Sequence, residues 1–292
     1  MRSFLFAPAD SDKKLEKGLS SGADVLLLDL EDSVALAAKP QARQRAAEFL
    51  RAHIGAAQRP RLIVRVNSLA SGLIDDDFEA IVSARPDGIM LPKAEGAASI
   101  VHADAKLSAR EAMHGLADAH IEIIAIATET AASLFRAGTY QGASPRLTGL
   151  TWGAEDLSAE LGAQANRDKD GNFLDPYRLA RVLCLAGAAT AEVQAIDTVY
   201  VDFRNETGLR RECEEACRDG FTGKMAIHPA QVAVINDVFT PSGEALARAQ
   251  AIVSAFAQQP EAGVIGIDGV MYDRPHLARA QRLIARATDS RR

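Results

Sequence analysis

The sequence has little of what marks disulfide-stabilised and zinc-thiolate proteins. Three cysteines, six histidines and one tryptophan occur among 292 residues, and aromatic residues make up 5% of the chain. Cys213 and Cys217 lie four residues apart, on one face of an expected helix, but no histidine is close to them in the sequence. Neither a disulfide framework nor a zinc site is therefore expected, and we predict reduced thiols.

Long apolar runs and an excess of positive charge are also absent. No window offers about 18 uncharged apolar residues, the length that a membrane span needs. The N-terminal stretch MRSFLFAPADSDKK has too short an apolar run for a signal peptide. The formal net charge of −6 argues against a nucleic-acid-binding protein, because neutralising phosphates requires a basic surface. We expect a cytoplasmic protein with neither a membrane nor a nucleic acid as its partner.

What the sequence does contain is a series of eight short apolar runs. They are continuous rather than alternating, which is typical of strands buried on both faces of a parallel sheet. The runs are SFLFAP from residue 3, DVLLLDLED from 24, RLIVRVNS from 61, GIMLPKAE from 88, IEIIAIATET from 121, LTGLTWGAED from 147, IDTVYVDF from 196 and GKMAIHP from 223.

Segments with helical character separate these runs, for example KPQARQRAAEFLRAH, DPYRLARVLCLAGAAT and ETGLRRECEEACRDG. Eight alternating units predict a closed (β/α)₈ barrel of the TIM type, although a doubly wound open sheet has the same local pattern. We place the barrel at residues 1–240 and a C-terminal helical extension at residues 241–292, with a glycine-rich hinge at Gly263, Gly266 and Gly269. The barrel does not need this extension to close, so we expect it to pack on a neighbouring subunit.

Polar residues gather where the expected strands end. They are Asp29, Glu31 and Asp32 after the second run, Arg65 and Asn67 on the third, Lys93 and Glu95 after the fourth, Glu129 after the fifth, and Glu155 and Asp156 after the sixth. In a barrel all of these positions open on the same mouth, which is where barrel enzymes carry their chemistry.

Glu129 and Asp156 are the acids most suggestive of a metal. On adjacent strands, two carboxylates about 4 Å apart would repel by about 4 kcal/mol at an effective dielectric constant of 20, so a cation is expected between them. With oxygen ligands and no histidine or cysteine nearby, we predict Mg²⁺. The alternative is that each acid only caps the helix that follows it.

An ordered series of motifs gives a more specific indication. The stretches are RSFLFAPA, LLLDLEDSV, IVRVNS, LPKAE, TET, GAEDLSAELG, DTVYVDFRNETGL, GFTGKMAIHPAQ and DGVMYDRPHLARA. Together they resemble the citrate lyase beta-subunit-like group of the HpcH/HpaI aldolase family over nearly the full chain. Two departures are ATET where the family often has IES or IET, and APA where it often has VPG. The first leaves the acid in place, and the second is expected to change how the first loop approaches a thioester.

The resemblance implies a Mg²⁺-dependent barrel that cleaves or forms a carbon–carbon bond in a 3-hydroxyacyl thioester, such as a citryl, malyl or citramalyl thioester. It implies Glu129 and Asp156 as metal ligands and Arg65 as the contact to substrate oxygens. It also implies Asp273, in GVMYDRP, as an acid or base contributed by a neighbouring subunit of a homo-oligomer, a trimer or hexamer. We place Lys93, Gly153 and Ala154 with Arg65 in the substrate-binding set.

Several alternatives stay open. Lys93 could form a Schiff base, although an ion-paired lysine is favoured because the acids already provide for a metal. His228 could face the mouth or be structural, and Asp273 could simply cap the last helix. The carrier, which the sequence leaves undecided between coenzyme A and an acyl carrier protein, could meet the basic residues Lys13, Lys14, Lys17, Lys39 or Arg43. The chain could also be a non-catalytic or regulatory binding subunit, or an aldolase of free 2-oxo acids.

Overall fold

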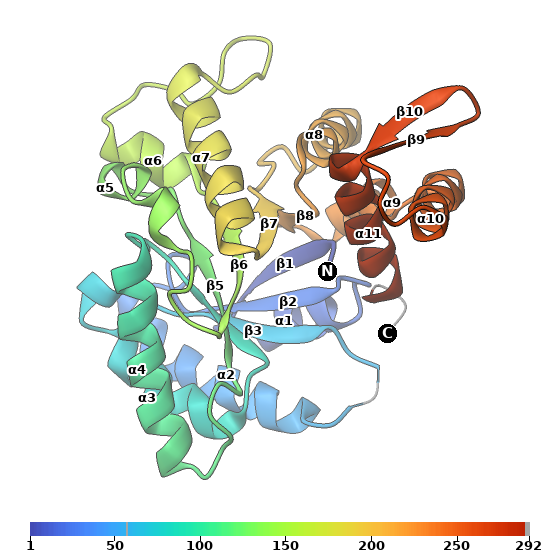
Figure 1. The fold of residues 1–292 in the computed structure, drawn as a ribbon. Coiled ribbons are helices and arrows are strands. Elements are labelled where there is room, and N and C mark those ends of the chain that lie inside the picture. The colour runs from blue at the N-terminus through green and yellow to red at the C-terminus, as the bar shows by residue number, and fades with distance from the viewer. Residues whose placement is uncertain (57, 290–292) are drawn as a thin grey trace.

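Eight parallel strands close into a barrel in the computed structural model, which describes residues 1–56 and 58–289 (Figure 1). Seven of the strands lie within their predicted runs. β7 begins two residues before its run and overlaps it only at Ile196 and Asp197, so the remainder of that run is loop. The predicted barrel is confirmed. The strands are β1 (Ser3–Pro8), β2 (Val25–Asp29), β3 (Arg61–Arg65), β4 (Gly88–Leu91), β5 (Glu122–Ile126), β6 (Leu147–Thr151), β7 (Gln194–Asp197) and β8 (Gly223–Ala226).

Helices connect the strands and surround the barrel. The α-helices are α1 (Asp12–Leu19), α2 (Lys39–His53), α3 (Ile74–Ile81), α4 (Ala97–Met113), α5 (Ala131–Leu134), α6 (Ala154–Glu160), α7 (Asp175–Ala191), α8 (Glu206–Asp219) and α9 (Val232–Phe239). Short 3₁₀ turns are η1 (Leu36–Ala38), η2 (Leu69–Ser71), η3 (Val82–Ala84), η4 (Ala137–Thr139) and η5 (Pro229–Gln231). In α2 a proline lies in the first turn, where its missing N–H costs no hydrogen bond.

The strands are apolar throughout because both of their faces are buried. One set of side chains fills the barrel: Phe4, Val25, Leu27, Ile63, Met90, Ile124, Ile126, Ile196 and Met225. The alternate positions, such as Leu26 and Leu62, point outward and belong to the larger core under the helices. This double burial explains why the runs in the sequence are continuous.

The three cysteines are free thiols, as predicted. Cys213 and Cys217 both lie on α8, but Cys213 is buried and Cys217 is exposed, so they do not share one environment. Within the described residues no helix combines the length and the apolar character that crossing a membrane requires.

A buried ion cluster ties the strand beginnings to α4. Arg146, just before β6, is fully buried, and its guanidinium donates to both carboxylate oxygens of Glu111 at 2.9 and 2.6 Å and to Asp118 at 2.9 Å. Glu111 is itself buried and also accepts from the amide of Ile121. Removing the arginine would therefore leave a buried carboxylate without its counter-charge.

We expect Arg146→Ala to lower the free energy of unfolding by about 3–5 kcal/mol, the usual cost of breaking a buried ion pair from one side. Urea unfolding followed by circular dichroism measures it. Lys106→Ala is the control, because Lys106 pairs with the exposed Asp75 and should cost less than about 1 kcal/mol. Equal, small losses in both variants would contradict the prediction.

Beyond the barrel the chain forms an arm made of two helices and a β-hairpin. Its elements are α10 (Gly243–Gln258), β9 (Val264–Ile267), β10 (Val270–Asp273) and α11 (Arg274–Asp289). The glycine-rich segment, expected to be a hinge in the helical extension, is instead this antiparallel hairpin, and the hinge expectation was wrong. Asp268 and Gly269 form its two-residue turn with φ of 51° and 78°, the left-handed conformation that tight hairpin turns require.

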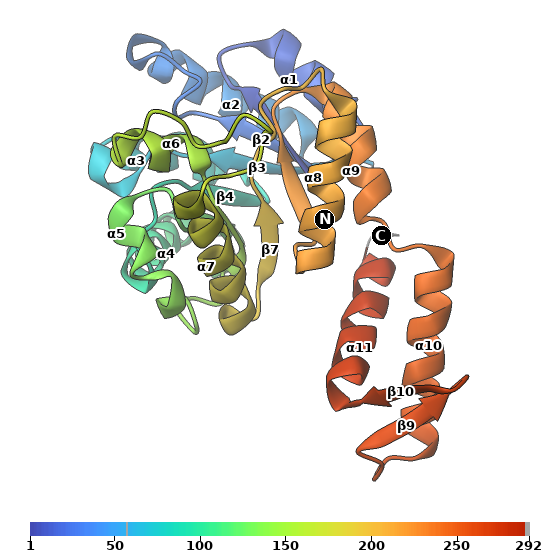
Figure 2. The same cartoon turned by 90° about the horizontal axis from the view of Figure 1, so that it is seen from above.

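The arm stands out from the barrel rather than packing along it (Figure 2). It has a small core of its own, made of Ala249, Ile252, Phe256, Ile265 and Ala280, and its described elements pack chiefly on one another. It leaves the barrel where the strands begin: Thr240, between α9 and α10, accepts a hydrogen bond from Arg2 at 2.8 Å, just before β1. The arm therefore departs from the end of the barrel opposite the mouth.

Candidate active site

Five successive strands deliver charged side chains to the mouth of the barrel. Asp29 is the last residue of β2 and Arg65 the last of β3, and the strand register places them side by side. Lys93 follows β4, Glu129 follows β5, and Asp156 lies in the first turn of α6 after β6. The structure thus brings together four of the predicted residues, Arg65, Lys93, Glu129 and Asp156. Asn67, Glu95 and Glu155 are bonded instead to Asp77, Arg136 and Asn166.

Arg65 is held in one orientation by a two-pronged ion pair. Its Nε and Nη2 donate to the two carboxylate oxygens of Asp29 at 2.7 and 2.6 Å, and its Nη1 lies 3.1 Å from Glu31 Oε2. Its guanidinium also lies over the ring of Phe6, 4.8 Å from the centroid. Burial alone would raise the pKa of Asp29, but the guanidinium of Arg65 outweighs it and holds that pKa below its ordinary value. The result is a fixed cation at the mouth.

Lys93 contacts acids that follow three different strands. Its backbone has φ of 52°, a conformation rare for a residue with a side chain, and its amide donates to Glu129 Oε2 at 2.7 Å. Its Nζ lies 2.6 Å from Glu31 Oε1 and 3.5 Å from Asp156 Oδ1. Burial would lower the pKa of Lys93, but Glu31 and the other acids raise it above its ordinary value. Lys93 is therefore a charged, ion-paired lysine, the arrangement favoured over a Schiff base.

Glu129 is a buried carboxylic acid whose pKa is strongly raised. Burial raises its pKa to about 8, and the negative charges of Asp156 and Glu31 add to this effect. Gly153 packs directly on it: a Cβ at that position would lie 3.3 Å from Glu129 Oε1. A buried carboxylate beside two other acids is short of positive charge, which a cation would supply.

The donor set fits a hard divalent cation. Glu129 and Asp156 offer only oxygen atoms, and the described residues include no group of three or more histidine, cysteine or acidic side chains placed to hold a metal. Magnesium commonly takes one or two protein carboxylates and fills its remaining positions with water and substrate. Two protein ligands at an open mouth agree with that pattern.

Three polar or aromatic groups at the mouth were missed from the sequence as parts of the site. Asp29 and Glu31 were noted only as strand-end acids, whereas the structure shows that they orient Arg65 and Lys93. Phe6 was not noted, although its place two residues after the inward Phe4 is a period-2 signal. Ala154 is buried, so only its backbone could serve the substrate-binding role predicted for it.

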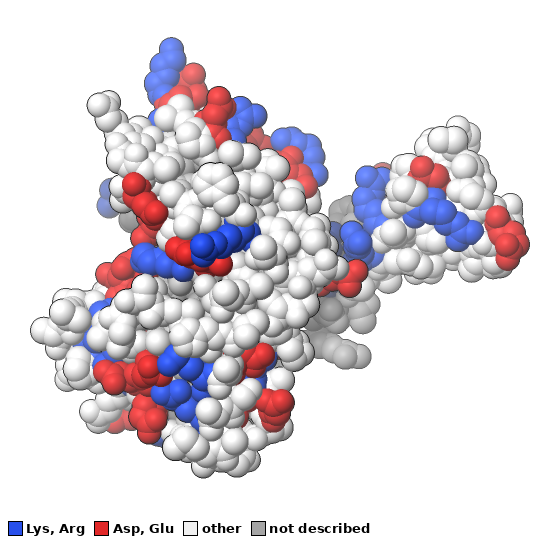
Figure 3. Space-filling view, turned by 60° about the vertical axis from the view of Figure 1, so that its left-hand side comes forward, with Lys and Arg blue, Asp and Glu red and all other residues white. Residues whose placement is uncertain are grey.

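Two of the basic candidates for carrier phosphates are already engaged. Lys39 Nζ donates to the carbonyls of Leu30 and Glu31 at 2.7 and 2.8 Å, and Arg43 pairs with Asp77 at 2.7 Å. Lys39 holds the loop after β2 and Arg43 ties α2 to α3, so the suggestion that they meet phosphates was wrong. Lys13, Lys14 and Lys17 remain exposed on α1. On the face shown in Figure 3, charges of both signs occur in small mixed groups separated by uncharged surface.

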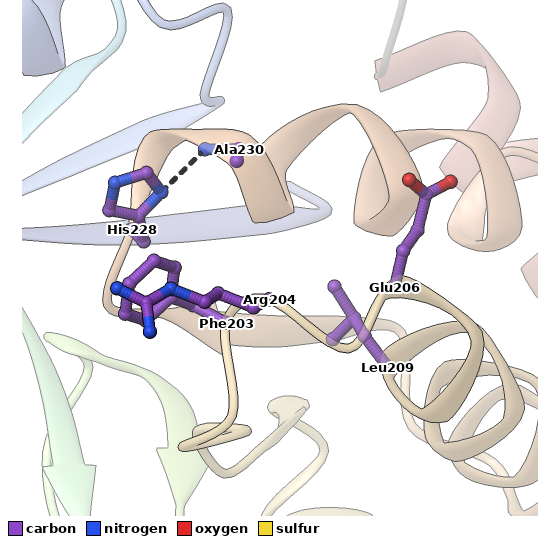
Figure 4. Close-up of a pocket in the computed structure, with 6 residues that line it drawn as sticks. All are labelled: Phe203, Arg204, Glu206, Leu209, His228 and Ala230. Carbon is purple, nitrogen blue, oxygen red and sulfur yellow. Dashed lines mark hydrogen bonds between the residues drawn. The ribbon is translucent and has the colours of Figure 1, made fainter.

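His228 has a structural role at the rim. Its Nδ1 accepts a hydrogen bond from the amide of Ala230 at 3.2 Å, which caps η5, and its ring stacks on Phe203 at 4.5 Å (Figure 4). The two rings border a hollow of about 340 Å³ between the β7–α8 and β8–η5 loops. None of the predicted metal or substrate ligands lines this hollow.

Asp273 lies apart from every other candidate. It is the last residue of β10, at the far end of the arm, while the mouth opens at the other end of the barrel (Figure 2). Its carboxylate caps α11, accepting from the amide of His276 at 3.3 Å, and its pKa is lowered by hydrogen bonding to His276. Asp273 can therefore reach a mouth only on a second copy of the chain.

A family model described as HpcH/HpaI aldolase/citrate lyase matches residues 2–229. The chain belongs to this family. The mitochondrial citramalyl-CoA lyase of Rattus norvegicus is 35% identical over 300 residues, covering 98% of this chain and 86% of that protein. The (3S)-malyl-CoA thioesterase of Cereibacter sphaeroides is 35% identical over 289 residues, covering 98% of this chain and 94% of that protein.

A solved structure from the same family extends the likeness to three dimensions. The crystal structure of protein CitE from Mycobacterium tuberculosis, in complex with magnesium, acetoacetate and coenzyme A, matches with a TM-score of 0.77 at 32% identity, covering 98% of both chains. The predicted family, the predicted fold and the prediction that the chain is an enzyme of this HpcH/HpaI family are confirmed. Magnesium, the predicted cofactor, is present in that relative.

Proposed function

We propose that this HpcH/HpaI family member is a Mg²⁺-dependent lyase that cleaves the carbon–carbon bond of a 3-hydroxyacyl-CoA bearing a carboxylate, of the malyl, citramalyl or citryl type. One observation supports this most directly: the fixed guanidinium of Arg65 lies at the same mouth as Glu129 and Asp156, and burial and the charge of Asp156 raise the pKa of Glu129. Relatives of this chain are named for acyl-CoA substrates, which supports coenzyme A over an acyl carrier protein.

In this reaction a base removes the proton of the 3-hydroxyl group and the bond between C2 and C3 breaks. The oxygen becomes the carbonyl of a 2-oxo acid, and the electron pair moves into the thioester as an enolate, which then takes a proton at C2. Arg65 is placed to stabilise the oxygen where this charge develops, because its guanidinium is already oriented by Asp29 and needs no reorganisation. Magnesium, when bound by Glu129 and Asp156, would add Lewis-acid stabilisation of the acid's oxygens.

We look for the proton acceptor outside this cluster, because Glu129 and Asp156 are the proposed metal ligands and Asp29 and Glu31 are paired with Arg65 and Lys93. We assign it to Asp273 of a neighbouring copy in a homo-oligomer. Its lowered pKa keeps it in the carboxylate form that a base requires. The arm carries it away from its own barrel, which supports a shared site.

The function is tested by incubating the purified chain with Mg²⁺ and a panel of malyl-, citramalyl- and citryl-CoA. A lyase releases glyoxylate, pyruvate or oxaloacetate together with acetyl-CoA, whereas a thioesterase releases free CoA and the hydroxy acid. A free 2-oxo acid aldolase would need no thioester at all. Absence of any Mg²⁺-dependent 2-oxo acid release from the panel would reject the lyase. If no free CoA were released and no free acid were cleaved either, a binding subunit would remain. The cytoplasmic location stays a prediction, since the rat relative is named as mitochondrial.

With the best substrate of that panel, Arg65→Lys should lose at least about tenfold in kcat/KM, equivalent to roughly 1.4 kcal/mol. Lysine keeps the charge but cannot make both hydrogen bonds to Asp29, so the cation loses its fixed orientation. Arg136→Lys is the matched control, because Arg136 pairs with Glu95 in a partly exposed position. Full activity in Arg65→Lys would exclude the role.

A further inference from the structure

A closed ring of side chains starts and ends at Trp152, the residue that follows β6. Trp152 is buried, and its Nε1 donates to Asp197 Oδ1, on the last residue of β7, at 2.8 Å. The other carboxylate oxygen of Asp197 accepts from Lys224 Nζ, on β8, at 2.7 Å. Burial disfavours both charges, but their mutual attraction outweighs it: the pKa of Lys224 is raised and that of Asp197 is lowered from their ordinary values. The two groups therefore form a charged pair in the interior.

The ring returns to Trp152 by way of α8 and a loop. Lys224 Nζ also donates to Glu212 Oε1 at 2.8 Å, and Glu212 Oε2 lies 2.8 Å from Arg167 Nη1. The guanidinium of Arg167 lies over the ring of Phe173, 3.6 Å from its centroid, and Phe173 meets Trp152 edge to face, with the two centroids 4.9 Å apart. The ring thus ties β6, β7, β8 and α8 to the loop that carries Arg167 and Phe173.

Arg167 and Phe173 form the root of a small hairpin between α6 and α7. They face each other across an isolated antiparallel bridge. Asp168 closes the tip, because its carboxylate accepts from the amides of Asp170 and Asn172 at 2.9 and 2.8 Å. The hairpin projects beside the start of α7 (Figure 1). Its root is the part that the ring holds in place.

The same hairpin contacts the turn that carries Asp156. Asn166, directly before Arg167, donates through Nδ2 to Glu155 Oε1 at 2.8 Å. Glu155 and Asp156 lie in the first turn of α6, whose N-cap residue, Gly153, makes no side-chain cap. With seven residues this helix is too short to be stable by itself. The position of its first turn therefore depends on contacts with the rest of the chain.

We propose that Arg167 is a positioning residue for Asp156. By closing the ring it fixes the root of the hairpin, and the first turn of α6 is then held from two sides. Asn166 holds it through Glu155, and Trp152 holds the chain from which the helix starts. Arg167 acts through these neighbours and not on the substrate. The inference rests on the proposed function, in which Asp156 binds Mg²⁺.

The first test measures how firmly α6 is held, with neither metal nor substrate present. In hydrogen–deuterium exchange on the metal-free chain, Arg167→Met should speed exchange of the amides of residues 158–161 at least about tenfold and leave those of α2 unchanged. Methionine keeps an apolar contact with Phe173 but loses the ion pair. The matched control is Arg210→Met, because Arg210 is an exposed arginine of α8 that pairs with Asp237 at 2.7 Å. Unchanged exchange in α6, or equal acceleration throughout the chain, would overturn the proposal.

A second variant tests the route through Asn166. Asn166→Ala removes only the contact with Glu155 and leaves the buried ion pairs intact. It should therefore speed exchange of the same amides of α6 while the melting temperature of the chain stays unchanged. This variant also decides the question if Arg167→Met does not fold. Exchange as slow as in the parent chain would overturn the route and, with it, the proposal.

The last test connects the position of α6 to the metal. In calorimetric titrations Arg167→Met should bind Mg²⁺ about tenfold more weakly, since the outer partners of metal ligands commonly contribute 10- to 100-fold to metal affinity. Adding Asn166→Ala should cost less than the product of the two single losses, because both residues act on the same turn; a loss equal to that product would overturn the shared route.

The titrations also separate this inference from the proposed function. If the parent chain binds Mg²⁺ and Arg167→Met binds it equally tightly, the inference alone is overturned. If the parent chain binds no Mg²⁺, the ligand assignment on which the inference rests is itself rejected. The exchange measurements then still report whether the ring holds α6, because they are made without metal.

Discussion

Replacing Glu129 by glutamine is expected to abolish Mg²⁺ binding and lyase activity while making the metal-free protein more stable at alkaline pH. Burial and the neighbouring acids raise the pKa of Glu129 to about 8 in the folded chain. Between its ordinary value and about pH 8 the folded state holds a proton that the unfolded state has lost, so stability falls as pH rises through this window. Above about pH 8 the full cost of the buried charge is present, and glutamine removes it.

Calorimetric titration with Mg²⁺ and thermal unfolding at pH 6 and pH 9 measure both effects. The melting temperature of Glu129→Gln should exceed that of the parent chain at pH 9 by at least about 2–4 °C, the shift that about 1 kcal/mol produces in a large domain, and by less at pH 6. Asp156→Asn should lose Mg²⁺ binding as well. The control is Glu95→Gln, since Glu95 likewise follows a barrel strand, β4, but pairs with Arg136 at 2.6 Å. Mg²⁺ affinity unchanged in both site variants would refute the ligand assignment.

Asp273→Asn is expected to lose about 10² to 10⁴ in rate, the usual contribution of a general acid or base, while binding Mg²⁺ as tightly as the parent chain. Asparagine can still cap α11, since its side-chain oxygen accepts from the amide of His276 as Asp273 does. The arm should therefore keep its fold, so a loss of activity reports on chemistry. Initial rates with the best CoA substrate, together with the Mg²⁺ titration, measure the two effects.

Mixing this variant with Arg65→Ala should restore part of the activity. The Asp273→Asn chain has an intact barrel and the Arg65→Ala chain has an intact arm, so a hybrid oligomer contains some sites with neither defect. The control is each variant alone, taken through the same procedure of mixing and subunit exchange. Full activity in a strictly monomeric protein would rule out a shared site, as would failure of verified hybrids to recover.

The sequence by itself determined the barrel and the residues that approach its mouth. Continuous apolar runs are required wherever a strand is buried on both faces, so their number and order predicted the eight strands. Parallel strands that alternate with helices all end at one edge, and this placed Arg65, Glu129 and Asp156 together before any contact was known. These inferences succeed because each depends on local pattern and on a topology with one mouth.

Only the tertiary structure decided which charges pair with which. Lys93 and Glu31 are 62 residues apart, and their contact depends on the left-handed backbone at Lys93, which no composition signal marks in a lysine. Lys39 and Arg43 could not be told from free cations, because their partners lie on other elements, the loop after β2 and helix α3.

In the arm, too, the sequence indicated the candidate residues and the structure decided their roles. Asp273 was visible in the sequence as a possible base and as a possible helix cap, and the structure shows the cap directly. The glycine-rich segment was also recognisable in the sequence, but glycine permits a hinge and a tight turn equally. The cross-strand pairing of β9 with β10 makes it a tight turn. The separation of Asp273 from its own mouth follows from the place where α10 leaves the barrel. Hydrogen bonds from Arg2 and Ser3 to Thr240 and Asn236 fix the end of α9 beside the beginning of β1.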